Sequence, residues 1–441
     1  MDNVVKLEAA RKESAAKRRA GLAPRGVGRP GSTDRRRRPR RSKTALVLGG
    51  GGFTGGVYEI GALRALDLLA VNSTVNQFDV YLGTSAGSFI AALCANGVTP
   101  EEMMRVVTRQ GKAPFKDIDI GDLLNLNLLE FARKGALLPL RTVSLARDLL
   151  SQRGAVSLMD VLLGLADGLP SGLYTGTGIE GYLHKVLSEP GRTDDFRDLA
   201  CDLYLTATDL DTCERIVFGA DGTDDVPIST AVRASGALPM VYAPVEINGR
   251  ELIDGGITST TNLDIAVEAG AHLVVVINPV VPFINDFTGT VRTLRGTRAR
   301  RVSDMGFPQI GYQAFKLVAH QRLHELAKHW QERYPGVDIL LIEPEPADEL
   351  MFQTSMMNFT SRVEIARHGF ESVTKHLVGE FERYREVAER HGIKISAKRV
   401  RQVVQHFDAD RLEPGQGEVS AWRKILEGTT GALLRQAGST G

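Results

Sequence analysis

The segment Phe78-Asp-Val-Tyr-Leu-Gly-Thr-Ser-Ala-Gly87 decides the fold. Its apolar part, Phe78–Leu82, predicts a buried strand, and the small residues of Ala86–Asn96 predict a helix that follows at once. Between them, Gly83-Thr84-Ser85-Ala86-Gly87 matches the pattern G-x-S-x-G. This pattern is typical of a sharp turn from strand to helix that exposes a serine, and Gly83 and Gly87 leave room for it. Ser85 is therefore a candidate nucleophile.

A second glycine-rich turn precedes this one. Thr44–Leu48 predicts a strand, Gly49–Gly56 is almost all glycine, and Val57–Ala70 has helical apolar spacing. Gly50, Gly52 and Gly55 also fit the dinucleotide-binding pattern G-x-G-x-x-G, but such a site needs an acidic residue at the end of the next strand. That strand ends instead at the Ser85 turn. We therefore interpret the glycines as backbone N–H donors for an anionic oxygen.

Charge is distributed unevenly. The 441-residue chain has a net charge of +1, but residues 1–43 hold 15 Lys and Arg against 4 Asp and Glu. We expect this basic arm to be disordered, because its composition cannot build a core. It either remains solvated or contacts a polyanion, and anionic lipid headgroups are favoured over nucleic acid.

Cysteines and apolar runs limit the classes of protein. Cys94, Cys201 and Cys213 are too few and too scattered for a disulfide framework or a zinc site. The start of the chain has no apolar signal region, and the most apolar run, Leu273–Ile284, is short and interrupted by prolines. We expect a cytoplasmic protein that meets lipid from the water side, peripheral to a membrane.

The remaining pattern alternates between strand and helix, which favours an α/β domain with a mainly parallel sheet. Residues 97–172 predict a helical insertion that either caps the site or packs on the sheet. Further elements are expected at Asp202–Asp209, Arg215–Phe218, Ile228–Ala237, Asn262–Ala269, His272–Asn278, Gln309–Trp330, Val337–Ile342 and Asn358–Arg390, with a hairpin at Asn248-Gly249. We divide the chain into a basic arm (1–43), a catalytic domain (44–380) and a helical extension (381–441).

A catalytic serine needs a base. The histidines His184, His320, His324 and His329 lie inside predicted helices, and His272 opens a strand at the wrong edge of the sheet. Asp254 is the better candidate, because it ends a predicted strand and is followed by Gly255 and Gly256. Buried beside a hydroxyl with no cation near, it would have a raised pKa. Its alternative role is that of a turn-forming residue before two glycines.

The ordered motifs Gly50-Gly51-Gly52-Phe53-Thr54-Gly55, Gly83–Gly87 and Asp254-Gly255-Gly256 together resemble those of the patatin-like phospholipases. Two further blocks agree, Thr206-Ala207-Thr208-Asp209-Leu210 and Ala234-Ser235-Gly236-Ala237-Leu238-Pro239. The resemblance covers Thr44–Pro279 well and implies a three-layer α/β/α sandwich. It also implies hydrolysis of lipid acyl esters, of the phospholipase A type, without a metal or organic cofactor.

By this resemblance, Ser85 is the nucleophile and Asp254 the base of a catalytic dyad. Gly50, Gly51 and Gly52 form the oxyanion hole, and the supporting glycines are Gly55, Gly83, Gly87, Gly255 and Gly256. The chain departs from the family at Thr54, where an Arg or Lys is usual. The expected substrate is a lipid ester. Alternatives are a catalytically weak or inactive lipid-binding protein, an acyltransferase that passes the acyl group to an alcohol, and an interaction protein that works through its arm.

Overall fold

The computed structural model describes residues 42–109, 115, 125–130, 132–134, 169–285, 291–292, 298–299, 301–346, 348, 350–351, 360–399 and 401. All of them belong to one compact unit, residues 41–441. Nearly all of the basic arm, most of the insertion at 97–172 and the chain beyond 401 lie outside the described residues.

A mostly parallel sheet forms the centre of the fold. Its strands are β1 (Thr44–Leu48), β2 (Val80–Thr84), β4 (Asp202–Asp209), β5 (Arg215–Phe218), β7 (Val245–Ile247), β8 (Arg250–Asp254), β9 (Leu273–Ile277) and β12 (Asp338–Ile342). The order is β12-β9-β1-β2-β4-β8-β7, with β5 also paired to β4. The first five strands run parallel, and β5, β7 and β8 are antiparallel to their neighbours. Two small ribbons stand apart, β3 (Gly172–Tyr174) with β6 (Met240–Tyr242) and β10 (Val291–Arg292) with β11 (Arg298–Ala299).

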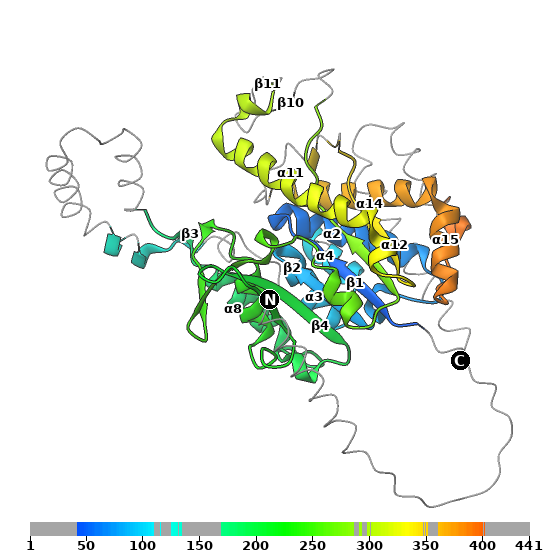
Figure 1. Cartoon of the computed structure of the whole chain (residues 1–441), viewed down its shortest axis with the longest axis horizontal. Helices are drawn as coiled ribbons and strands as arrows, with labels where there is room; N and C mark the ends of the chain where they lie inside the picture. Colours follow the sequence, from blue (N-terminus) through cyan, green and yellow to red (C-terminus); the bar gives the residue numbers. More distant parts are fainter. Residues whose placement is uncertain are drawn as a thin grey trace, which may run out of the picture. The chain divides into compact units, whose positions relative to one another are not determined.

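Helices cover both faces of this sheet (Figure 1). Alternate residues of β1 point to opposite faces, so Leu46 and Leu48 enter one apolar core and Ala45 and Val47 the other. The first core is shared with α2 (Gly52–Leu69), α3 (Ala86–Ala95), α4 (Pro100–Thr108), α8 (Thr177–Leu187), α9 (Ile228–Ser235), α14 (Arg362–Gly379) and α15 (Phe381–Arg390). The second is shared with α10 (Asp264–Glu268), α11 (Phe307–Lys328) and α12 (Trp330–Arg333). The 3-10 turns are η1 (Val75–Gln77), η2 (Phe196–Asp198), η3 (Gly255–Ile257) and η4 (Val302–Met305).

The three-layer α/β/α architecture expected from the sequence is confirmed. Among the helices of the described residues, none combines the length and the apolar character needed to cross a membrane. The hairpin expected at Asn248-Gly249 is also present between β7 and β8. Both turn residues have positive φ, 53° and 74°, as a type I′ turn requires.

Helix boundaries differ from the expected ones where glycine or packing outweighs local pattern. Helix α2 begins at Gly52 and not at Val57, and its first residues pack against the Ser85 turn: a Cβ at Gly56 would be in van der Waals contact with the Cβ of Ala86, 3.5 Å away. The expected helix at 309–330 ends at Lys328, and a short helix follows from Trp330. The helical stretch expected to end at Arg390 is divided at Glu380.

Two glycines let α14 lie directly against α2. A Cβ on Gly61 would come within 2.1 Å of the Ala366 carbonyl oxygen, and one on Gly369 within 2.4 Å of the Tyr58 carbonyl oxygen. Farther on, residues 394 and 396 are hydrogen-bonded to the chain at Val71 and Leu69. We therefore propose that the layered domain continues past the expected boundary at residue 380 to about Ser396.

We predict that Gly61→Ala destabilises the protein by at least about 1–3 kcal/mol, because the added methyl group must separate two packed helices. Gly181→Ala is the matched control. Gly181 also lies in a helix, but a Cβ there would meet nothing within 4 Å. Its replacement should stabilise the protein by about 0.5–1 kcal/mol through the better helix propensity of alanine. Urea unfolding measures both changes, and equal effects of the two would contradict the close packing of α2 on α14.

Candidate active site

The turn at Ser85 is strained. Strand β2 ends at Thr84 and α3 begins at Ala86, so Ser85 alone makes the reversal, with φ 55° and ψ −127°. Such a backbone conformation costs a non-glycine residue about 1–3 kcal/mol. Hydrogen bonds hold the turn in place: the Ser85 N–H donates to Ser235 Oγ at 2.9 Å, and the Ser88 hydroxyl donates to the Ser85 carbonyl at 2.5 Å. The backbone of Ser85 is thereby held in this conformation.

Strand β4 brings Asp254 to this turn. Thr84, the last residue of β2, pairs with Thr206 on one edge of β4. Strand β8 pairs with the same edge in the opposite direction and ends with Asp254 opposite Ala207. Both strands must lie on the same edge of β4, because β5 pairs with Thr206 and Ala207 and therefore occupies the opposite edge. The C-terminal ends of β2 and β8 therefore face each other at neighbouring residues of β4. This places Ser85, the residue after β2, next to Asp254, the last residue of β8.

Ser85 and Asp254 form a direct hydrogen bond. The Ser85 hydroxyl donates to Asp254 Oδ2 at 2.5 Å, and the Gly256 N–H donates to Asp254 Oδ1 at 2.7 Å. Asp254 is only 3% exposed, and no basic side chain of the described residues forms an ion pair with it. Burial raises its pKa from 3.8 to about 6, although the two hydrogen bonds oppose the shift. The raised pKa expected from the sequence is therefore found.

A network of buried polar side chains lies next to Ser85 and Asp254. Asn262 donates from Nδ2 to the hydroxyl oxygens of Thr84 and Thr206, both at 3.1 Å, and these two hydroxyls are themselves 3.0 Å apart. The hydroxyl of Thr208 donates to the Asp254 carbonyl at 3.3 Å. These bonds join the ends of β2 and β4 to the loop after β8. They fix the relative positions of the two strands that carry Ser85 and Asp254.

The glycine turn lies beside Ser85. A Cβ on Gly50 would come within 3.1 Å of the Ser85 Cβ, and Gly51 has φ 130°, which favours glycine. Among the described residues, no acceptor takes a backbone hydrogen bond from the N–H of Gly50 or Gly51. Gly52 opens the 18-residue helix α2, whose N-terminal end carries partial positive charge. Thr54 lies in the same first turn and is buried.

The supporting glycines are sites of close backbone approach. A Cβ on Gly87 would lie 2.3 Å from the Gly49 carbonyl oxygen, and one on Gly255 would lie 2.3 Å from that of Thr206. Similar contacts restrict Gly55 and Gly83, whereas the space at Gly256 is only slightly tight. These residues bring three backbone segments together around the serine.

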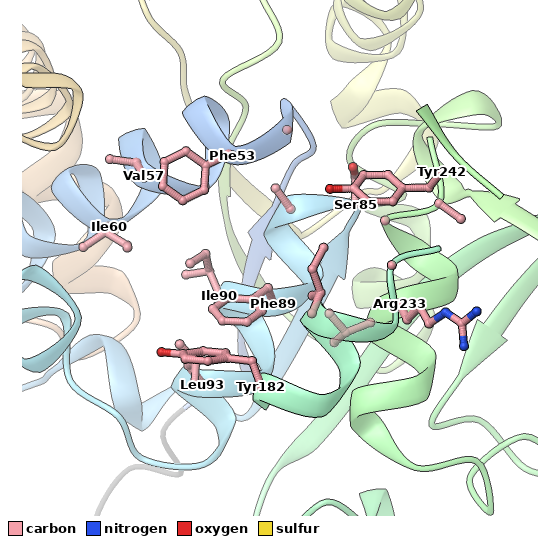
Figure 2. Close-up of a pocket in the computed structure, with 18 of the residues that line it drawn as sticks. Phe53, Val57, Ile60, Ser85, Phe89, Ile90, Leu93, Tyr182, Arg233 and Tyr242 are labelled. Atoms are coloured by element: carbon pink, nitrogen blue, oxygen red, sulfur yellow. The ribbon is translucent and has the colours of Figure 1, made fainter. Parts of the chain in front are cut away.

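An apolar cavity of about 150 Å³ opens beside Ser85. Figure 2 shows that its walls come from α2, α3 and α8 and carry Phe53, Val57, Ile60, Phe89, Leu93 and Tyr182. The lining residue Arg233 does not offer a free cation, because its guanidinium donates to Glu180 at 2.9 Å and to the Thr175 carbonyl at 3.2 Å. A cavity of this volume can hold a small hydrocarbon group. The site therefore combines a hydroxyl–carboxylate pair with room for an apolar ligand.

The sequence-predicted residues lie together, and some supporting residues were not predicted. Ser85, Asp254 and Gly50–Gly52 meet at one corner of the sheet, while no described histidine hydrogen-bonds to the pair. Sequence reasoning did not assign roles to Thr84, Thr206, Ser235 or Asn262. The first three lie inside motifs that were noted, so their position was a usable signal. Asn262 lies in no motif, and only the folded chain shows its contacts.

Comparison with known proteins adds three findings. The model of the patatin-like phospholipase family matches residues 46–267, which is half of the chain. A probable lipid hydrolase, 463L of Invertebrate iridescent virus 6, is 25% identical over 237 residues, which are 52% of this chain and 65% of the viral protein. The chain thus spans less than two thirds of that curated relative.

The fold is also similar to solved structures. VipD from Legionella pneumophila has 16% identity and a TM-score of 0.36, with 77% of this chain and 67% of VipD covered. Human GIVD cytosolic phospholipase A2, solved with methyl gamma-linolenyl fluorophosphonate, has 10% identity and a TM-score of 0.32, with coverages of 80% and 60%. At scores this low, neither likeness bears on the chemistry of this chain.

The raised pKa of Asp254 predicts a stability change for Asp254→Asn. Below about pH 4 the wild-type carboxyl is protonated in both the folded and unfolded states. Above pH 6 the folded state must bury its charge, and asparagine avoids this cost. The variant should therefore be more stable than wild type by about 3 kcal/mol at pH 8, with a much smaller difference at pH 4.

Chemical unfolding at both pH values measures this difference. Asp211→Asn is a suitable control, because Asp211 is exposed and its replacement should change stability little at either pH. A gain for Asp254→Asn that is the same at pH 4 and pH 8 would contradict the buried charge.

Proposed function

Because this chain belongs to the patatin-like phospholipase family, we propose that it hydrolyses acyl esters of lipids through a covalent intermediate on Ser85. The observation that carries this proposal is the 2.5 Å hydrogen bond from the Ser85 hydroxyl to Asp254, at the mouth of an apolar cavity. A hydroxyl alone is a weak nucleophile, and a carboxylate that already accepts its proton is suited to activate it. The viral relative described as a probable lipid hydrolase supports the same class of substrate.

In the proposed reaction, Ser85 Oγ attacks the ester carbonyl carbon as its proton passes to Asp254. The N–H groups of Gly50, Gly51 and Gly52 stabilise the resulting oxyanion, each by roughly 3 kcal/mol by analogy with other oxyanion donors. The tetrahedral intermediate collapses, and the leaving alcohol or lysolipid takes the proton from Asp254. Water then attacks the acyl-serine as one of its protons passes to Asp254. The bond from the acyl carbon to Ser85 Oγ breaks, Oγ takes the proton back from Asp254, and the fatty acid leaves. A pKa near 6 makes Asp254 a stronger base than a solvated aspartate while it remains ionised at neutral pH.

The surroundings of the cavity favour a water-insoluble substrate. Tyr242 of strand β6 lines the cavity, and β6 pairs with β3. On this ribbon and the adjoining segment, Leu173 is 47% exposed, Met240 79% and Leu126 55%. Met240 and Leu126 share one face of the ribbon, because they pair with Gly172 and Tyr174, and exposed apolar side chains gathered on one face mark surfaces that contact other molecules or lipid. We propose that they touch the lipid surface while one acyl chain enters the cavity, so that the protein acts peripherally on a membrane.

A fluorophosphonate probe should label wild-type protein at Ser85, and Ser85→Ala should abolish both labelling and turnover of a lipid ester. Asp254→Asn should lower turnover by at least about 1000-fold, because no other base among the described residues hydrogen-bonds to the serine hydroxyl. Lipid products are measured by mass spectrometry, with and without an added alcohol, so that acyl transfer is distinguished from hydrolysis. Ser188→Ala is the control, since Ser188 is exposed at the end of α8.

Three outcomes would count against the assignment. Folded protein that takes no label and has no turnover would be a lipid-binding protein. Label on another serine would move the nucleophile, and near-normal turnover by Asp254→Asn would require a different base.

A larger side chain in the cavity should alter the preference for acyl length. Ile179 lies on α8 and lines the cavity, so Ile179→Trp should lower kcat/KM for a long-chain ester at least about 10-fold relative to an acetate ester. Ile310→Trp makes the same change on the exposed surface of α11, where Ile310 is 46% exposed, and should leave the ratio unchanged. If both variants leave the long-to-short ratio of wild type intact, the acyl chain binds elsewhere.

A further inference from the structure

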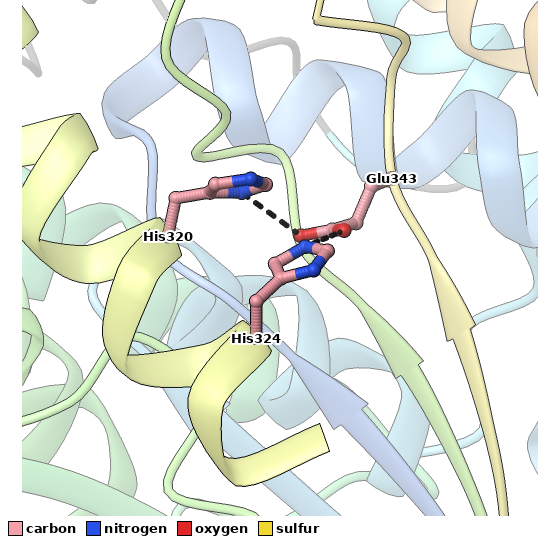
Figure 3. A group of neighbouring side chains, drawn as sticks. All are labelled: His320, His324 and Glu343. Atoms are coloured by element: carbon pink, nitrogen blue, oxygen red, sulfur yellow. Dashed lines mark hydrogen bonds and ion pairs between the residues drawn. The ribbon is translucent and has the colours of Figure 1, made fainter. Parts of the chain in front are cut away.

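Two histidines and a glutamate lie close together near the C-terminal ends of the parallel strands, the same end of the sheet that carries the Ser85 turn. His320 and His324 lie one turn apart on α11, and Glu343 follows the last residue of β12 (Figure 3). The distance from His324 Nε2 to Glu343 Oε2 is 2.8 Å, and that from His320 Nδ1 to Glu343 Oε1 is 3.9 Å. One nitrogen from each ring and a carboxylate oxygen all lie within 4.8 Å of one another.

We propose that His320, His324 and Glu343 bind a divalent metal ion, with Zn²⁺ as the best fit. Imidazole nitrogen and carboxylate oxygen are common zinc ligands, and histidines four residues apart on a helix present their rings to the same ion. Ligands about 2.0–2.1 Å from a tetrahedral zinc lie about 3.3 Å from one another. The observed separations are 2.8 Å from His324 Nε2 to Glu343 Oε2 and 3.9 Å from His320 Nδ1 to Glu343 Oε1. They lie on either side of this value, and binding of the ion requires the side chains to rotate until the carboxylate and both rings face it. Magnesium and calcium prefer sites made of oxygen ligands.

The contacts around the three residues favour a metal over a simple histidine–glutamate pair. One histidine would satisfy the carboxylate, yet the two rings lie with their centroids 3.9 Å apart around it. His320 Nδ1 is buried and has no hydrogen-bond partner among the described residues. Asn278, which is 1% exposed, donates from Nδ2 to Glu343 Oε1 at 2.7 Å and so orients the carboxylate. Oriented carboxylates of this kind surround metal ions in proteins.

The position of the site indicates a structural ion. In the sheet order, β12 and β2 are separated by three strand spacings, or about 14 Å, so the ion cannot touch an ester at Ser85. It would instead fasten α11 to the ends of β12 and β9. The same helix contacts the segment after Asp254, since Arg322, between the two histidines, donates to the Thr258 carbonyl at 3.2 Å. The side chain of His324 is 42% exposed, which leaves a water-accessible fourth position.

No metal was expected from the sequence, because the family resemblance implies none and the three cysteines are too scattered for a zinc site. The histidines were considered only as bases. Their spacing on one helix was visible, but the third ligand comes from a strand 19 residues away from His324 in the chain. Only the packing of α11 beside β12 brings Glu343 to them.

The test uses the full-length protein, stripped of metal with a chelator and dialysed. Isothermal titration with Zn²⁺ should give one strong site per chain. His324→Gln and Glu343→Gln should each weaken its affinity at least about 100-fold, because each removes a ligand from a three-ligand site. Glu343→Gln keeps an oxygen that can accept the Asn278 hydrogen bond, so it should fold. His329→Gln is the matched control, since His329 ends the same helix, is 66% exposed and lies outside the cluster.

Co²⁺ provides a second measurement. Its visible absorption should report a tetrahedral site in wild type and in His329→Gln, and the signal should be lost in Glu343→Gln. Wild type that binds Zn²⁺ no more tightly than folded Glu343→Gln, or that loses binding with His329→Gln, would overturn the proposal. Both measurements are made without substrate, so their outcome is independent of whether Ser85 is catalytic.

Discussion

The structure depends on the way two strands share one edge of β4. Strand β2 runs parallel to β4 and ends with Thr84 opposite Thr206, whereas β8 runs antiparallel and ends with Asp254 opposite Ala207. Ser85 and Asp254 are 169 positions apart in the sequence, and pairing of the strands brings their backbones close together. The side chains then need only reach each other to form the 2.5 Å hydrogen bond. A one-residue change of register moves a strand by about 3.3 Å, which is more than the whole length of this hydrogen bond. The relative positions of Ser85 and Asp254 are therefore set by the register of the strands in the sheet.

The backbone conformation of Ser85 and the buried carboxylate of Asp254 are both unfavourable for folding, and hydrogen bonds from surrounding residues offset part of this free energy. Ser85 has an unfavourable backbone conformation, and Asp254 has its pKa raised by burial. Ser235 accepts a hydrogen bond from the Ser85 N–H, whereas Asn262 and Gly256 donate hydrogen bonds to Thr84 and Asp254. Each of these bonds holds part of the site in place. Such local strain is typical of functional sites, because the geometry that reacts is seldom the geometry that folds best.

Much of this organisation could be predicted from the sequence, and the reasons differ between elements. The G-x-S-x-G turn and the Asn248-Gly249 hairpin were predictable because their residues require particular backbone angles. Asp254 could be chosen as the candidate base because it lies at a strand end before two glycines. The early start of α2 at Gly52 was not predictable, because glycine is a poor helix former and its packing on the Ser85 turn is a tertiary effect. Asn262 and the cluster at Glu343 likewise depend on contacts between segments that carry no common pattern.

The order of strands in the sheet has a consequence for biosynthesis. Strand β1, which leads to the glycine turn, is flanked on one side by β9 and then β12, and α2 is covered by α14. These partners are translated some 200 to 300 residues after β1. While the ribosome is still extending the chain, the segment with Ser85 and Asp254 lacks one flank of its sheet and the cover of its first helix. The packing around the glycine turn beside Ser85 is therefore completed only after α14 has been translated.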